Sequence, residues 1–243
     1  MSSNPGKPDG AGRRRLYLVR HGQVNYFDDT GRPLDPRSVR LSEDGEAQVR
    51  ALGKLLQTET FDRAISSDYP RAVQTLEMIL SGGASAGSIE ATPALREVRA
   101  GRLSLMPLEA YESEVSGAYH WSQNKGSGFL RGERWDDFSA RVLDWFQTFL
   151  ADSDWQSAVI ASHDAVNRVL ISWLVNGDLS ALPFLEQDPA CINIVDIDCS
   201  EECRPVTAYL RLLNYTPYNP TKSGERLTVM ERITQSMLQM CSQ

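Results

Sequence analysis

Short runs of apolar residues alternate with longer amphipathic stretches along this chain of 243 residues. A short run of apolar and small residues between polar ones is typical of a buried strand. Apolar residues that recur every three or four positions, such as Val49, Leu52 and Leu56, are typical of a helix with one buried face. These patterns predict strands at 16–19, 64–66, 157–161, 192–197 and 206–213, and helices at 43–57, 70–80, 135–150, 163–175 and 225–240.

The order of these elements predicts one α/β domain, which we place at residues 15–243. Strands that alternate with helices favour a three-layer α/β/α fold with a mostly parallel central sheet. Ser42 is a suitable N-cap for the first helix, and Pro70 suits the first turn of the second. Residues 1–14 are predicted to be a disordered lead-in that contains no secretory signal. Residues 102–134 fit no regular element and are predicted to form an inserted cap segment over a pocket.

Charge and composition exclude several classes of function. The formal net charge of −7 disfavours a nucleic-acid partner, because the only cluster of basic residues is the short run at 13–15. No apolar run approaches the roughly 18 residues that a membrane span needs. Cys199 and Cys203 have the spacing of half a metal site, but no second Cys or His pair accompanies them. The four cysteines are therefore interpreted as reduced thiols of a cytoplasmic protein that binds no metal.

Basic side chains follow three of the predicted strands. Arg20 and His21 come after the first, Arg71 lies in the turn after the second, and His163 follows the third. Because the carboxyl ends of neighbouring parallel strands share one crevice, these side chains would converge if the three strands are neighbours. The two helices that begin there would add backbone N–H groups and the positive ends of their dipoles. Gly22 permits the turn that brings Arg20 and His21 to one pocket, and the pattern predicts an anion site.

Four blocks of sequence then carry a resemblance to a known family. They read LVRHGQ at 18–23, SSDYPRAVQT at 66–75, LRE at 95–97 followed by Gly101, and ASHD at 161–164. Together they resemble the histidine phosphatase superfamily, whose signature is the RHG tripeptide and whose fold is phosphoglycerate mutase-like. The blocks occur in the order typical of that family and span about residues 15–215.

The resemblance implies a role for each matching residue. His21 would be the nucleophile that becomes phosphohistidine, and Arg20 and Arg71 would bind the phosphoryl oxygens together with His163. Glu97 would protonate the leaving alcohol and then activate water, although it could also be an ordinary exposed carboxylate. Such a site needs no metal or cofactor, because a neutral imidazole is a nucleophile at neutral pH and guanidinium groups can balance the phosphoryl charge.

The sequence also departs from the family pattern. Phe27 occupies the position where many members have Asn, and Asn25 is the candidate to replace that residue in phosphate binding. The run EVRAG at 97–101 lacks the Tyr of the cofactor-dependent mutases, which favours a phosphatase that acts on a small phosphorylated substrate. A phosphoglycerate mutase-type transferase and a catalytically idle module that binds a phosphoester or a protein remain the alternatives. The sequence leaves the substrate and the oligomeric state open.

Overall fold

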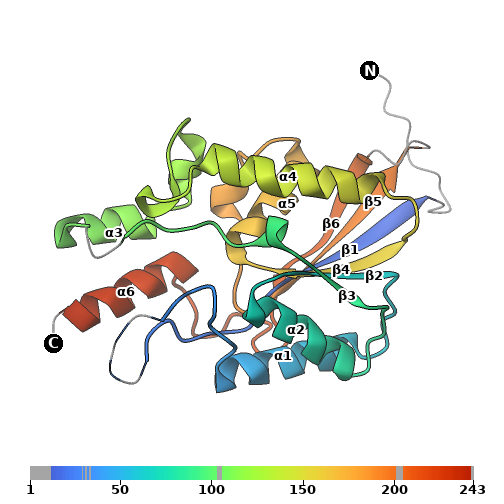
Figure 1. Cartoon of the computed structure of the whole chain (residues 1–243), viewed down its shortest axis with the longest axis horizontal. Coiled ribbons are helices and arrows are strands. Elements are labelled where there is room, and N and C mark those ends of the chain that lie inside the picture. Colours follow the sequence, from blue (N-terminus) through green and yellow to red (C-terminus); the bar gives the residue numbers. More distant parts are fainter. Residues whose placement is uncertain are drawn as a thin grey trace.

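A six-stranded mixed sheet forms the centre of the computed structural model, which describes residues 12–28, 30, 32, 34–102, 106–200 and 205–241 (Figure 1). The strand order is β3-β2-β4-β1-β5-β6. The first four strands in this order are parallel to one another, and β5 and β6 are antiparallel additions beside β1. The strands are β1 (Arg13–Arg20), β2 (Arg63–Ser67), β3 (Ile89–Thr92), β4 (Ser157–Ser162), β5 (Ile192–Cys199) and β6 (Pro205–Tyr215).

Helices cover both faces of the sheet and make the fold three-layered, as the sequence predicts. They are α1 (Glu43–Leu56), α2 (Pro70–Ser81), α3 (Leu108–Ser116), α4 (Trp135–Ala151), α5 (Asp164–Asn176) and α6 (Val229–Cys241). Figure 1 shows α1 and α2 below the sheet and α4 and α5 above it. Side chains of β1 alternate between the two cores, since Leu16 and Leu18 pack with α4 and α5 whereas Tyr17 and Val19 pack with α1 and α2.

Local sequence signals account for the ends of several helices. The Ser42 side chain accepts a hydrogen bond from the backbone N–H of Gly45 and caps α1, and Pro70 begins α2. The last helix begins at Val229, four residues later than the predicted helix at 225–240. Thr228 and Glu231 explain the difference, because each accepts a hydrogen bond from the backbone N–H of the other in a capping box.

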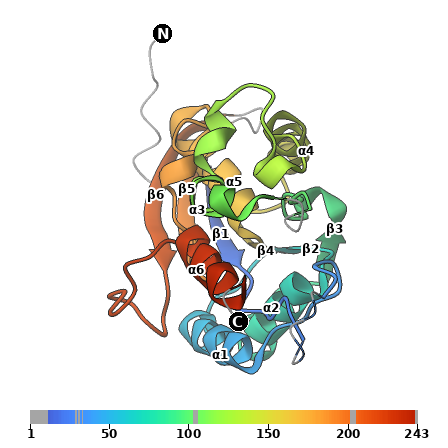
Figure 2. The same ribbon diagram turned by 90° about the vertical axis from the view of Figure 1, so that its left-hand side faces the viewer.

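The segment 102–134 contains regular structure, and the prediction of an irregular segment was wrong there. It includes α3, and the α3 residue Ser116 shares a hydrogen bond of 3.1 Å with Thr234 of α6. Figures 1 and 2 show α3 and α6 together beyond the end of β1 that leads towards α1. Part of the segment, residues 103–105, lies outside the described residues.

Two further predictions concern the ends of the chain and its relation to membranes. Strand β1 begins at Arg13, and residues 1–11 of the predicted lead-in lie outside the described residues, as does Cys203. Among the described residues, no helix has the length and apolar character needed to cross a bilayer.

Candidate active site

The strand order brings the predicted site residues together. Strands β2 and β1 both pair with β4, and the register places Arg20 of β1 opposite Ser162 of β4. The backbone N–H of His21 continues this pairing by donating to the Ser162 carbonyl, at 3.0 Å. Gly22 then lies so close to α1 that a Cβ atom would be 2.5 Å from the carbonyl oxygen of Gly45. This position therefore requires glycine for the close approach of two backbones.

His21 is held as a neutral imidazole with a defined tautomer. Its Nδ1 atom lies 2.7 Å from the Gly22 carbonyl oxygen, which can only accept, so Nδ1 carries the proton. Its Nε2 atom accepts a hydrogen bond of 3.1 Å from Nε of Arg71. Burial and the positive charges of Arg71 and Arg20 hold the pKa of His21 well below its usual value. The Nε2 atom consequently keeps its lone pair at neutral pH.

His163 lies beside His21 at the start of α5 and is completely buried. The centroids of the two imidazole rings are 5.1 Å apart, and the ring of Tyr69 is 5.4 Å from that of His163 on another side. Burial and the nearby Arg71 lower the pKa of His163 well below its usual value, so this imidazole is also neutral. Its Nε2 atom is 2.9 Å from Oγ of Ser67, whereas Nδ1 is buried and has no hydrogen-bond partner.

Both predicted arginines are fixed by backbone carbonyl groups from loops. Arg71 donates through Nη1 to the carbonyl of Pro36, and Arg20 donates through Nη1 to the carbonyl of Gln187, each at 2.5 Å. Arg20 also lies 3.8 Å from a carboxylate oxygen of Asp164. The Nε atom of Arg20 is buried and has no hydrogen-bond partner. The two guanidinium groups thus approach His21 from different elements and retain N–H groups that an anion could use.

Two backbone N–H groups hold the carboxylate of Glu97, which lies within the electrostatic influence of Arg20 and Arg71. One carboxylate oxygen accepts from the N–H of Val98 at 3.0 Å, and the other accepts from the N–H of Ala165 at 3.4 Å. Burial and the negative charge of Asp164 raise the pKa of Glu97 to about 7. Asp164 itself is buried and accepts a hydrogen bond of 2.5 Å from Nε of Arg168. A carboxyl group with such a pKa can donate and accept protons near neutral pH.

The remaining predicted residue, Asn25, is exposed on the loop between β1 and α1. It follows Val24, which forms an isolated β-bridge with Leu41. Phe27 on the same loop is exposed as well. The role of Asn25 as a phosphate ligand stays a prediction.

Sequence reasoning missed several groups that complete the site. The carbonyls of Pro36 and Gln187 come from loops, and no local pattern indicates that a loop carbonyl will contact a distant arginine. Ser67 and Asp164 lie within the blocks that resemble the family, and they could have been singled out as polar residues near the carboxyl ends of buried strands. In the described part of the chain, no three His, Cys, Asp or Glu side chains are grouped so that they could hold a metal ion.

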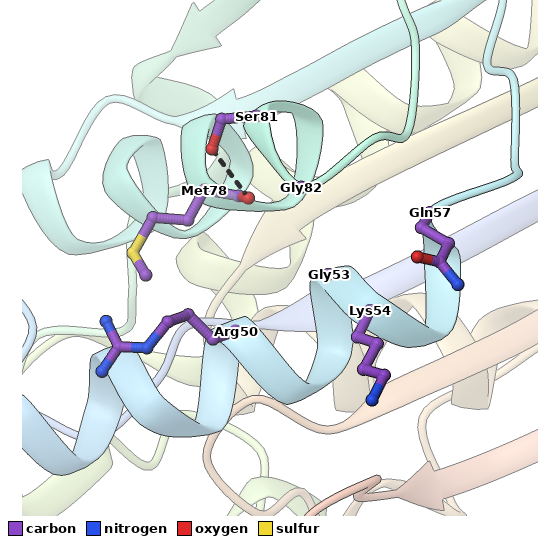
Figure 3. A pocket seen from close by; sticks show the side chains of 7 residues that line it. All are labelled: Arg50, Gly53, Lys54, Gln57, Met78, Ser81 and Gly82. Atoms are coloured by element: carbon purple, nitrogen blue, oxygen red, sulfur yellow. Dashed lines mark hydrogen bonds between the residues drawn. The ribbon is translucent and has the colours of Figure 1, made fainter.

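A separate surface hollow of about 450 Å³ lies between α1 and α2 (Figure 3). Its lining residues include Arg50 and Lys54 from α1, Gln57 directly after that helix, and Met78 and Ser81 from α2. These residues lie towards the carboxyl-terminal ends of the two helices, whereas Arg71, which contacts His21, lies at the amino-terminal end of α2. The hollow is therefore distinct from the cluster around His21.

Comparison with known proteins assigns the family. The model of the histidine phosphatase superfamily (branch 1) matches residues 16–206, which include every predicted site residue. The chain therefore belongs to the histidine phosphatase superfamily, and the resemblance inferred from the four sequence blocks is confirmed.

Several proteins that are similar to this chain in sequence or in structure are named as phosphatases. The adenosylcobalamin/α-ribazole phosphatase of Salmonella typhimurium is 28% identical over 188 residues, which cover 75% of this chain and 90% of that protein. The solved structure of the α-ribazole phosphatase from Shigella flexneri is 25% identical, with a TM-score of 0.62 and coverage of 82% of this chain and 96% of that one. A mycobacterial glucosyl-3-phosphoglycerate phosphatase has the same fold, with a TM-score of 0.67 at 21% identity and coverage of 83% and 99%.

Proposed function

We propose that the protein hydrolyses a small phosphomonoester through a phosphohistidine formed on His21. The observation that carries this proposal is that two buried nitrogen atoms of residues beside His21, Nε of Arg20 and Nδ1 of His163, have no hydrogen-bond partner. Leaving a buried polar atom unpaired costs about 1–3 kcal/mol, and a bound phosphoryl group would supply an acceptor for both nitrogens. Both belong to residues that surround the available lone pair of His21, where a phosphoryl group would need electrophilic support.

The geometry supports a first step in which Nε2 of His21 attacks phosphorus. The bond between phosphorus and the ester oxygen breaks, and Glu97 transfers its proton to that oxygen so that an alcohol leaves. Arg20, Arg71 and His163 balance the charge on the three other phosphoryl oxygens. For this to happen, Arg71 exchanges its hydrogen bond with His21 for one with a phosphoryl oxygen.

In the second step, water attacks the phosphorus of phosphohistidine. Glu97 is now a carboxylate and takes a proton from the water, the bond between Nε2 and phosphorus breaks, and inorganic phosphate is released. A pKa of about 7 suits Glu97 to both directions of proton transfer. Covalent catalysis of this kind divides one very slow hydrolysis into two easier displacements.

Rapid quenching in base with a phosphate-labelled substrate tests the proposal, because phosphohistidine survives base and is hydrolysed in acid. The chain has three histidines, and His120 contacts Phe184 rather than the site, which makes it the matched control. We expect acid-labile label on the wild-type protein and on His120→Ala, none on His21→Ala, and phosphate release that persists in EDTA. Label that persists on His21→Ala would contradict the proposal.

The same panel of phosphomonoesters separates the alternatives. Isomerised phosphoglycerate that depends on a bisphosphate primer would identify a mutase. Binding of phosphomonoesters without label or turnover would identify an idle module. Release of free phosphate without transfer to a second substrate supports the phosphatase.

A further inference from the structure

Ser67 is a fully buried residue at the end of β2, and it contacts His163 on the side away from its unpartnered nitrogen. The Oγ atom of Ser67 lies 2.9 Å from Nε2 of His163. The same Oγ accepts a hydrogen bond of 3.3 Å from the backbone N–H of Tyr69, where the chain turns into α2. Ser67 thus connects the polypeptide turn that carries Arg71 with the second histidine of the site.

The protons in this arrangement can be assigned from the chemistry of each group. A backbone N–H only donates, so Ser67 must use an oxygen lone pair towards Tyr69 and still has its hydroxyl proton to donate. His163 is neutral, because burial and the charges of Arg71, Arg20 and Arg141 lower its pKa. A neutral imidazole has one N–H and one bare nitrogen. If Ser67 donates to Nε2, the proton of His163 is on Nδ1.

We propose that Ser67 is a positioning residue that fixes His163 in the Nδ1–H tautomer and so presents an N–H donor to the phosphoryl group. In the other tautomer, Nδ1 would carry a lone pair, which would repel a phosphoryl oxygen instead of binding it. The inference rests on the proposed function for its effect on turnover. The tautomer itself is a property of the free protein and can be measured without substrate.

Ser66 provides a matched control at the preceding position. Both serines are fully buried on β2, but Oγ of Ser66 has no hydrogen-bond partner, whereas that of Ser67 contacts His163. Replacing either serine by alanine removes the same atom from adjacent positions of one strand. Only Ser67→Ala removes a hydrogen bond to the imidazole.

The first measurement is ¹⁵N NMR of the histidine rings near pH 7.5. The three histidines can be assigned by comparison with His21→Ala and His120→Ala. We expect a protonated Nδ1 and an unprotonated Nε2 for His163 in the wild-type protein and in Ser66→Ala. In Ser67→Ala we expect a substantial population of the Nε2–H form. A wild-type His163 with its proton on Nε2 would overturn the proposal, as would a tautomer that does not change in Ser67→Ala.

The second measurement compares anion affinity and turnover. We expect Ser67→Ala to weaken orthophosphate binding and to lower kcat/KM by about tenfold, the usual loss for one hydrogen bond to an anion. Ser66→Ala should stay within about twofold of the wild type, and Ser67→Thr, which keeps the hydroxyl, should recover most of the loss. Equal losses in the two alanine variants would overturn the proposal and assign Ser67 a packing role.

The role of Ser67 can be decided even if one variant does not fold or the proposed function fails. If Ser67→Ala does not fold, Ser67→Cys replaces it, because a thiol of similar size is a weak hydrogen-bond donor and should produce the same tautomer change. If the wild-type protein hydrolyses no phosphomonoester, the proposed function fails, and the NMR and orthophosphate measurements still decide the role of Ser67.

Discussion

The pKa of about 7 for Glu97 leads to a quantitative prediction for the pH dependence of catalysis. With that pKa, about nine-tenths of Glu97 is protonated at pH 6 and about one-tenth at pH 8. Formation of phosphohistidine needs the protonated form, because an alkoxide is a poor leaving group. For an alkyl phosphate we therefore expect kcat/KM to fall about tenfold for each pH unit above pH 7.

Glu97→Gln removes the proton donor and leaves a side chain of nearly the same size. General acid catalysis typically contributes about 10²–10⁴-fold, so we expect a loss of that order in kcat/KM for an alkyl phosphate. The loss should be much smaller for 4-nitrophenyl phosphate, because nitrophenolate is stable enough to leave without a proton. The decline above pH 7 should disappear in this variant.

The assay is kcat/KM between pH 5 and pH 9 for an alkyl phosphate and for 4-nitrophenyl phosphate, with the wild-type protein and Glu97→Gln. Glu59→Gln is the control, because Glu59 accepts a hydrogen bond from Tyr17 elsewhere in the fold and an amide can still accept it. The reasoning would be refuted by a basic decline that persists in Glu97→Gln, or by equal losses on the two substrates.

Three further predictions follow from other contacts. Asp164→Asn removes a negative charge that raises the pKa of Glu97, so the basic decline of kcat/KM should begin at lower pH, and an unchanged midpoint would count against this coupling. The pKa of His21 is lowered by folding, so the unfolded state binds more protons and stability should fall as the pH drops below about 6.5. His21→Ala should make that slope shallower by up to about 1.4 kcal/mol per pH unit in urea titrations, and identical slopes would refute the assignment. Gly45→Ala places a Cβ 2.1 Å from the backbone oxygen of the neighbouring loop and should lower the free energy of unfolding by about 1–3 kcal/mol, whereas Gly87→Ala meets no atom within 4 Å and should change it little.

The sequence predicted the central elements because their burial leaves a simple pattern. Strands β1 and β4 lie inside the sheet with helices on both faces, so their central residues are buried and form an apolar run. Strand β3 was missed because it is a four-residue edge strand with two exposed residues and no apolar run. Helix α3 was missed because its structure depends on contacts with α6, more than 100 residues later.

The convergence of Arg71, His21 and His163 was predictable because each follows a strand of one parallel sheet. The tautomers and the raised pKa of Glu97 were not predictable. They depend on the exact positions of the Gly22 carbonyl and the Asp164 carboxylate, which are fixed only by the complete packing of loops and helices. Residue identity thus indicates which groups meet, and tertiary structure decides their protonation.

The hydrogen bond from Arg71 to Nε2 of His21 also bears on which molecules can react with this imidazole. An uncharged alkylating or acylating reagent offers the guanidinium no better acceptor, and the nitrogen lone pair stays engaged. In the proposed reaction, a phosphate dianion would compete for the same N–H and would free the nitrogen as it binds. If His21 is the nucleophile as proposed, the arginine would select by the charge of the incoming molecule and would protect the histidine from chemical damage between turnovers.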